Sequence, residues 1–225
     1  MESKLGLYDL LARLVPGGFL LWGLAWMAGQ AGLGWLLPNG MSSASQAIAF
    51  VLVAYVFGLV SHALGDWVIE GAIYRVKGRP SDQYLVDESP KRRYRVLLRE
   101  SIQTLSPNAS LDFSGDPDSK KRASHEAFRL ALNYVEDTSP KVQALQAQYG
   151  LHRSIAAACL LLTVTSLVGL IQAILPWGFF AGFGLLAGLF TMATYKWGCN
   201  LVRGTIEVAA SRLRSTEKAA SEETA

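Results

Sequence analysis

A histidine and two carboxylates recur at four-residue intervals in one of the most apolar parts of the sequence. They are His62, Asp66 and Glu70, within the stretch GLVSHALGDWVIEG at residues 58–71. Positions four apart lie on one side of a helix, so these side chains would form a polar column. Such a column fits a catalytic set or the lining of a polar passage, because ionisable groups inside a membrane are functional candidates. It also fits the end of a membrane helix that emerges into water, with His62 hydrogen-bonded to Asp66.

A catalytic or metal role finds little support elsewhere in the chain. The sequence has no P-loop, Gly-x-Ser-x-Gly, His-Glu-x-x-His or Cys-x-x-Cys motif, and Cys159 and Cys199 lack metal-ligand spacing. His125 and His152 have no spacing that recruits them. The column itself rises over about 12 Å of helix, too far for all three side chains to hold one metal ion. We therefore expect no catalytic residues, no metal site and no cofactor.

Five cations lie within nine residues in the central part of the chain: Lys91, Arg92, Arg93, Arg95 and Arg99. Such a run suits a phosphate-bearing ligand or the anionic lipids of a membrane surface. Contact with membrane lipids is favoured, because the run is tethered near apolar segments and no glycine-rich phosphate loop accompanies it. Nucleic acid is not expected as a partner.

The elements that must position these residues are membrane helices. The chain is 51% hydrophobic, 17% charged and has a mean hydropathy of +0.24. Four apolar runs are long enough to cross a hydrocarbon core of about 30 Å, at residues 16–37, 46–66, 154–175 and 177–199. The pattern predicts an all-α membrane protein with four transmembrane helices in two hairpins. A small cytoplasmic helical module lies between the second and third spans.

Charge placement predicts the orientation. Lys4 and Arg13 precede the first run, fourteen lysines and arginines lie between Arg75 and Arg153, and five follow from Lys196. The two other connections, at residues 38–45 and around Pro176, carry no charge. Positively charged segments stay in the cytoplasm. We expect a multi-pass protein of the bacterial inner membrane with both termini in the cytoplasm.

This topology predicts a labelling result. In a cysteine-free background, single cysteines placed at Asn39 and at Ser114 should react with a membrane-impermeant thiol reagent from opposite faces of the membrane. Labelling of both positions from the same face would reject the four-span topology.

Five regions are expected along the chain. Residues 1–15 read as an interfacial amphipathic helix ended by Pro16, Gly17 and Gly18. Residues 16–76 hold the first hairpin with a cytoplasmic extension, 77–152 the helical module, 153–214 the second hairpin with its extension, and 215–225 a disordered tail. Within the module, the pattern predicts a helix at about 119–136 that buries Phe128, Ala131, Leu132 and Val135. Another begins at Ser139 and Pro140 and continues into the third span.

Association is predicted from glycines at small-xxx-small spacing in the fourth span: Gly178, Gly182, Gly184 and Gly188. Such faces let helices approach closely, either within one chain or in a homo-oligomer.

The leading hypothesis is a non-enzymatic, oligomeric membrane protein whose module senses a ligand or cytoplasmic protein partner. The module then alters the membrane bundle, so that the protein acts as a channel-like or membrane-perturbing effector. Its layout is similar to small multi-pass proteins of bacterial stress and antiviral systems. The alternatives are a scaffold that recruits a cytoplasmic enzyme and, less favoured, a membrane-embedded enzyme that uses His62, Asp66 and Glu70.

Overall fold

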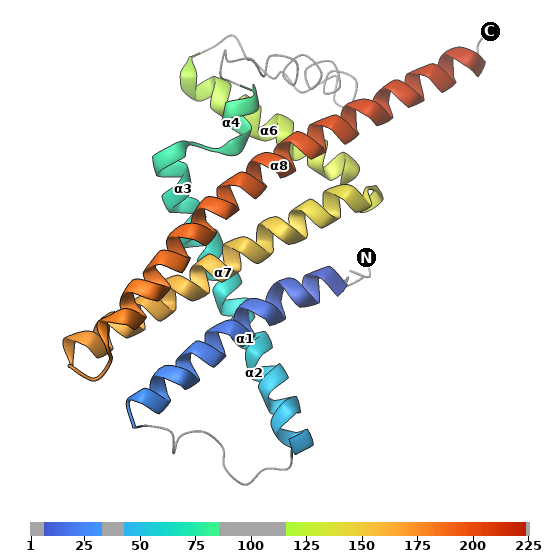
Figure 1. Cartoon of the computed structure of the whole chain (residues 1–225). Helices are drawn as coiled ribbons and strands as arrows, with labels where there is room; N and C mark the ends of the chain where they lie inside the picture. The colour runs from blue at the N-terminus through green and yellow to red at the C-terminus, as the bar shows by residue number, and fades with distance from the viewer. Residues whose placement is uncertain (1–6, 33–42, 86–115, 224–225) are drawn as a thin grey trace. The chain divides into compact units, whose positions relative to one another are not determined.

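The described part of the chain is built from helices alone. The computed structural model describes residues 7–32, 43–85 and 116–223, and no strand occurs among them (Figure 1). The basic run from Lys91 to Arg99 and the positions Asn39 and Ser114 lie outside these ranges. The all-helical fold class is confirmed for the described residues.

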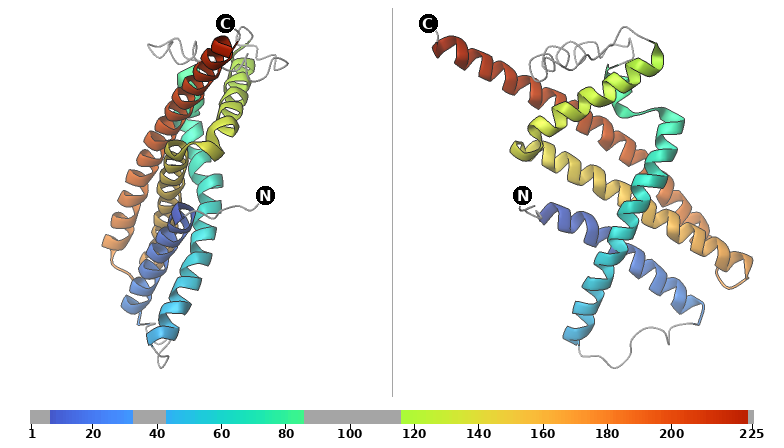
Figure 2. Two further views of the ribbon diagram at one scale, coloured as in Figure 1. Left: turned by 90° about the vertical axis from the view of Figure 1, so that its right-hand side faces the viewer. Right: turned by 180° about the vertical axis from the view of Figure 1, so that it is seen from behind.

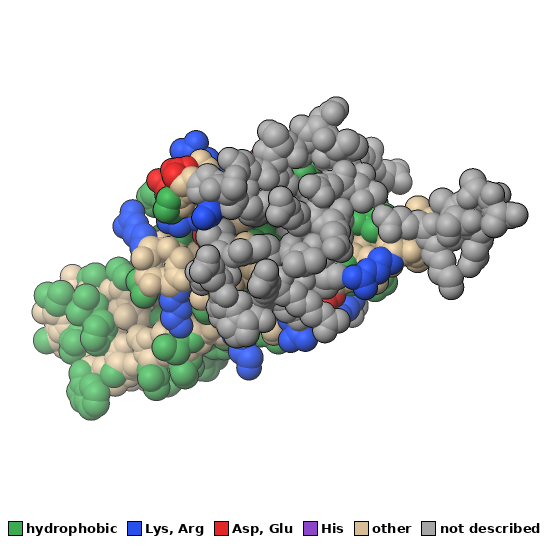
Figure 3. All heavy atoms as spheres, turned by 90° about the horizontal axis from the view of Figure 1, so that it is seen from above, with side chains coloured by type: hydrophobic (Ala, Val, Ile, Leu, Met, Phe, Trp, Pro, Cys, Tyr) green, Lys and Arg blue, Asp and Glu red, His purple; other side chains and the backbone are tan. Residues whose placement is uncertain are grey.

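Four helices are long and apolar enough to cross a membrane, as predicted. The candidate spans are Leu10–Gln30, Ala44–Leu85, Pro140–Ile171 and Trp177–Thr216. Hydrophobic side chains gather toward one end of the visible surface (Figure 3), and many apolar side chains of the spanning helices are exposed, as expected for helices that face lipid. Ile171, Trp177 and Leu185 are among the exposed ones. The pairing of the spans into two hairpins stays a prediction.

The spanning helices are longer than the apolar runs. They are α1 (Leu7–Gln30), α2 (Ser43–Leu64), α7 (Pro140–Ile171) and α8 (Trp177–Glu223). Helix α2 continues without a break through a π-helical turn, η2 (Gly65–Ile69), into α3 (Glu70–Lys77). Helix α8 runs to Glu223, so residues 215–223, expected to be a disordered tail, are helical.

The expected break at Pro16 is absent. Helix α1 passes through Pro16, so the amphipathic stretch and the first span form one helix. A proline inside a helix removes one backbone hydrogen bond, which usually ends or kinks the helix. Here Pro16 and Gly17 are buried, and tertiary packing outweighs the local preference.

Contacts divide the chain into two compact units. The first comprises the described residues of Met1–Arg75 and Ala147–Thr194, and the second those of Val76–Gln146 and Tyr195–Ala225. Helices α7 and α8 each contain residues of both units. The core of the first unit combines α1, α7, the segment after α7, and α8, and its buried members are Leu20, Met27, Ala158, Leu162, Leu175 and Phe183.

Helices α1 and α2 cross with their backbones in contact (Figures 1 and 2). A β-carbon on Gly17 would lie 1.7 Å from the carbonyl oxygen of Ala54, and one on Gly58 would lie 1.9 Å from that of Arg13. Only glycine permits this approach, because any side chain would collide with the facing backbone. The Cα hydrogens of each glycine then lie against a carbonyl oxygen of the other helix. The guanidinium of Arg13 also donates to the hydroxyl of Tyr55 across the pair, at 3.1 Å.

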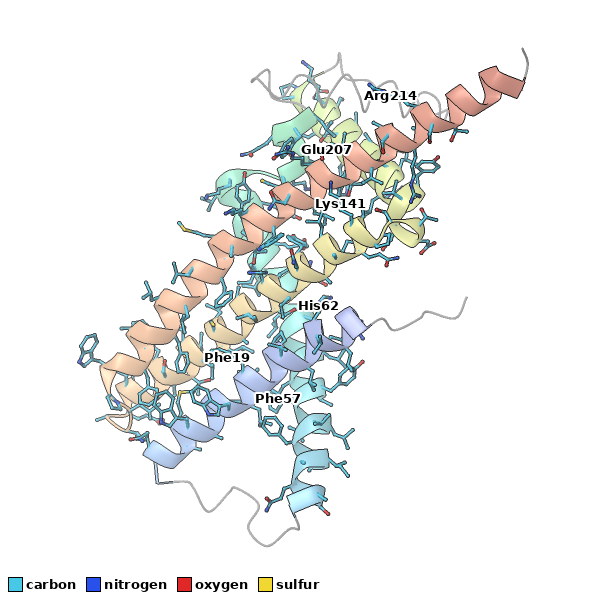
Figure 4. All side chains as sticks on the ribbon, turned by 45° about the vertical axis from the view of Figure 1, so that its right-hand side comes forward. Phe19, Phe57, His62, Lys141, Glu207 and Arg214 are labelled. Carbon is cyan, nitrogen blue, oxygen red and sulfur yellow. The ribbon has the colours of Figure 1, made fainter. Side chains whose placement is uncertain are left out.

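The second unit packs small side chains between α4 (Pro80–Leu85), α6 (Pro117–Val135), η3 (Glu136–Thr138) and the adjoining parts of α7 and α8. Helix α6 buries a stripe of Ala123, Ala127, Ala131 and Val135, which confirms Ala131 and Val135 of the predicted set, whereas Phe128 and Leu132 are only half-buried. Gly204 lets Leu145 approach α8, since a β-carbon there would lie 2.5 Å from the Leu145 Cδ1. Lys141 and Glu207 pair at 3.6 Å and are labelled in Figure 4.

Two helix starts in this unit are capped, and the cap at Ser139 is the one predicted from the sequence. The Ser139 hydroxyl accepts from the Val142 backbone N–H at 3.4 Å, immediately before Pro140 opens α7. Asp116 caps α6 by accepting from the Ser119 N–H at 3.2 Å, and hydrogen bonding by Ser119 lowers the pKa of the Asp116 carboxyl. Both caps fix where the helices begin.

Candidate functional site

The three residues of the polar column lie on one continuous helix. His62 is in the last turn of α2, Asp66 is in η2, and Glu70 begins α3. In η2 the Glu70 backbone N–H donates to the carbonyl of Gly65, five residues earlier. Such π-turns hold an extra residue per turn and change which way the following side chains point. The spacing at residues 62–70 is therefore not that of a plain α-helix.

All three column residues contact α7, and the centre of the contact is Arg153. Its guanidinium forms ion pairs with Asp66 and with Glu70. The same side chain lies 3.3 Å from the Nε2 of His62 through its Nη2. One arginine of α7 therefore joins three residues of the facing helix. Figure 4 labels His62 on α2.

Hydroxyl groups complete the site on both helices. Glu70 accepts from the Tyr149 hydroxyl at 2.7 Å and from the Tyr74 hydroxyl at 3.0 Å. The Nδ1 of His62 lies 3.2 Å from the Ser154 hydroxyl oxygen, and that hydroxyl donates to the Gly150 carbonyl at 2.8 Å. We name these seven side chains the Arg153 network: His62, Asp66, Glu70, Tyr74, Tyr149, Arg153 and Ser154.

One glycine makes room for the network. A β-carbon on Gly65 would lie 3.0 Å from the Cγ of Arg153 and 3.2 Å from its carbonyl oxygen. One on Gly150 would lie 3.8 Å from the imidazole of His62, an ordinary van der Waals distance. The two helices thus approach closely where the polar groups meet, so that the short distances follow from the backbone.

The network is graded in exposure and carries an excess carboxylate. The side chains of Arg153 and Glu70 are 11% and 19% exposed, whereas that of Asp66 is 51% exposed. One cation faces two carboxylates. Desolvation offsets much of the attraction in such a buried pair, yet removal of one partner leaves an uncompensated charge. The Nε of Arg153 is buried, and no described residue pairs with it.

The remaining histidines lie apart from this network. His152 has its Nδ1 2.8 Å from the Gln148 carbonyl oxygen, and its ring lies 6.0 Å from that of Phe190. His125 belongs to α6, where burial lowers its pKa and the positive charges of Arg79 and Arg129 lower it further. Among the described residues, no group of three His, Cys, Asp or Glu side chains could hold a metal ion. Neither Cys159 nor Cys199 forms a disulfide among the described residues.

The glycines of the fourth span lie in a different environment from those of α1 and α2. Around the β-carbon positions of Gly178, Gly182 and Gly188, no described atom outside the local helix lies within 4 Å, and Gly184 meets only the Thr163 methyl, at 3.6 Å. Among the described glycines, the closest backbone approaches are those at Gly17 and Gly58. Their signal was present in the sequence, because Ala54, Gly58, Ser61 and Gly65 give small residues along one side of the second span.

Sequence reasoning missed four members of the network. Tyr74 continues the column at the same four-residue spacing after Glu70, and Tyr149 stands four residues before Arg153. Both spacings are readable signals. Arg153 was counted only among the positive charges that flank the third span, and Ser154 only as that span's first residue.

Comparison with protein-family models, with curated proteins and with solved structures finds no match for this chain.

Proposed function

We propose that the chain is a non-enzymatic protein of the bacterial inner membrane whose cytoplasmic helical module senses a ligand or a protein partner and alters the packing of the transmembrane helices. The observation that carries this proposal is the Arg153 network. Its ion pairs join Arg153 of α7 to Asp66 and Glu70 of the helix that contains the π-turn. We propose that these ion pairs hold the two helices together when formed and release them when broken, and we call the network a latch in this sense.

A latch is favoured over a catalytic column by the partners of its residues. Asp66, Glu70 and His62 all contact Arg153, so the column is engaged by protein groups. General acid or base chemistry needs a group within reach of a substrate proton. An ion pair between two helices instead has two discrete arrangements, formed and broken, as a switching element requires.

Helix α7 supplies the means by which the module could act on the latch. It is one helix that contains Val142 of the second unit and Arg153 of the first. Rotation or displacement of its first turns by a bound ligand would be transmitted along the helix to Arg153.

We propose further that the protein acts as a homo-oligomer. The open glycine face at Gly178, Gly182 and Gly188 supports this, because small residues favour contact between membrane helices.

Opening the latch should increase membrane leakage. The double variant Asp66→Asn, Glu70→Gln removes both carboxylates while it keeps their size, and leaves Arg153 without an anionic partner in the network. In vesicles of phosphatidylethanolamine and phosphatidylglycerol, this variant is expected to release an encapsulated dye several times faster than the wild type at equal protein content. Dye fluorescence measures the rate.

The matched control is Glu207→Gln, which removes a carboxylate paired with Lys141 and Arg203 in the second unit. It should release dye at the wild-type rate. If the double variant keeps its helix content and also leaks like the wild type, the effector function is wrong. Capture of a cytoplasmic partner, lost on charge reversal at Arg92, Arg95 and Arg99, would then favour the scaffold.

A further inference from the structure

We infer that protonation of His62 transfers Asp66 from Arg153 to His62, so that acidification exchanges a contact between helices for one within a single helix. The inference concerns regulation of the same network and rests on its proposed role as a latch. It follows from hydrogen-bond directions within the described residues.

The contacts of His62 with Ser154 and Arg153 favour one tautomer of its ring. The Ser154 hydroxyl donates its only hydrogen to the Gly150 carbonyl, 2.8 Å away. Its oxygen is therefore an acceptor toward the Nδ1 of His62 at 3.2 Å, so Nδ1 carries the hydrogen. The Nε2 then presents a lone pair to the Arg153 guanidinium at 3.3 Å, which suits a donor without any acceptor capacity. This arrangement suits a neutral His62.

Adding a proton to Nε2 reverses that contact. An imidazolium N–H would face a guanidinium N–H, two donors and two positive charges. Asp66 lies beside both groups, because it and His62 contact the same Nη2 of Arg153. A protonated His62 can pair with Asp66 four residues along its own helix. Arg153 then keeps Glu70 through Nη1 and loses both contacts made by Nη2.

Charge balance supports the exchange. The neutral-histidine network holds one cation and two carboxylates, and one added proton makes the charges equal. Asp66 is the more exposed of the two carboxylates. The titratable or charged groups that the described contacts place in this network around His62 are Arg153 and Tyr149 from α7, and Asp66, Glu70 and Tyr74 from its own helix.

The test measures the separation of the two helices. Spin labels are placed on exposed positions of α2 and α7, Ala63 and Gln148, with Cys159 and Cys199 replaced by alanine, in lipid nanodiscs. Lowering the pH from about 8 to 5, the range in which histidine changes charge, should lengthen or broaden the wild-type distance distribution.

His62→Gln keeps a donor for Ser154 and an acceptor for Arg153 but cannot ionise, so its distance distribution should not change with pH. The matched control His125→Gln, on α6, should keep the wild-type transition. A wild type without a transition, or a transition that persists in His62→Gln, overturns the inference. Dye leakage is not the readout, so failure here is distinguishable from failure of the proposed effector function.

Nitrogen-15 NMR of histidine in the wild type covers the case in which His62→Gln does not fold. The chain has three histidines, and variants at His125 and His152 assign the signal of His62. The signal should change from the Nδ1–H tautomer to the doubly protonated form over the pH range of the distance change. A His62 that stays neutral through that change overturns the inference.

Discussion

Replacing Arg153 by methionine is expected to lower the free energy of unfolding by about 3 kcal/mol, within the range for loss of one partner of a buried ion pair. The variant keeps an unbranched side chain of similar reach but leaves the largely buried Glu70 carboxylate without its cation. Asp66 adds less, because half of its side chain is exposed. Unfolding by denaturant in mixed micelles, followed by circular dichroism, measures the change.

The loss should be partly rescued by Glu70→Gln in the same chain, because the amide can still accept from Tyr149 and no charge is left buried. The rescue distinguishes an unpaired charge from simple loss of packing. The control Arg203→Met removes the cation of an exposed pair with Glu207 and should cost no more than about 1 kcal/mol. Equal losses for Arg153→Met and Arg203→Met would show that the network contributes nothing special.

Alanine at Gly17 or Gly58 is expected to destabilise the first unit by about 1–3 kcal/mol or more, the range for overpacking a well-packed contact. The new methyl group would fall within 2 Å of a backbone oxygen of the facing helix, which cannot move aside without separating α1 from α2. The same unfolding measurement applies. Cysteines introduced on facing sides of α1 and α2 should also cross-link more slowly in the alanine variants than in the parent chain.

Gly29 supplies the control on the same helix. No described residue lies within 4 Å of a β-carbon placed there, outside the local helix. Gly29→Ala should therefore be neutral or stabilising, since alanine favours a helix over glycine by about 1 kcal/mol. Opposite signs at Gly17 and Gly29 are the expected result. A loss at Gly29 as large as at Gly17 would mean that the close crossing of α1 and α2 does not determine stability.

The spans could be predicted because hydropathy is a property of each segment alone. The caps at Asp116 and Ser139 are equally local, since a capping side chain and the backbone it bonds lie within three residues. Pro16 was misread for the converse reason. Its local preference is to end a helix, and its burial depends on residues distant in the sequence.

The partners of the column could not be read from the second span. Whether His62, Asp66 and Glu70 face water, lipid or an arginine depends on the rotation of that helix against α7, and η2 changes this rotation. Glycine spacing has the same ambiguity. The second and fourth spans both carry small residues at helical intervals, but only a structure shows that Gly58 meets a backbone while Gly182 does not.

The π-turn restricts the number of residues between His62 and Glu70 more than it restricts the identity of its exposed residues. Trp67 and Val68 lie in η2 with exposed side chains, so their identities are open to change without loss of a buried contact. Their number is not. Adding one residue there would turn every later position of the helix by about 100° around its axis, and Glu70 and Tyr74 would leave Arg153 and Tyr149. Evolution can therefore substitute Trp67 and Val68 freely, whereas an insertion between His62 and Glu70 would have to be matched by a deletion within the same few residues.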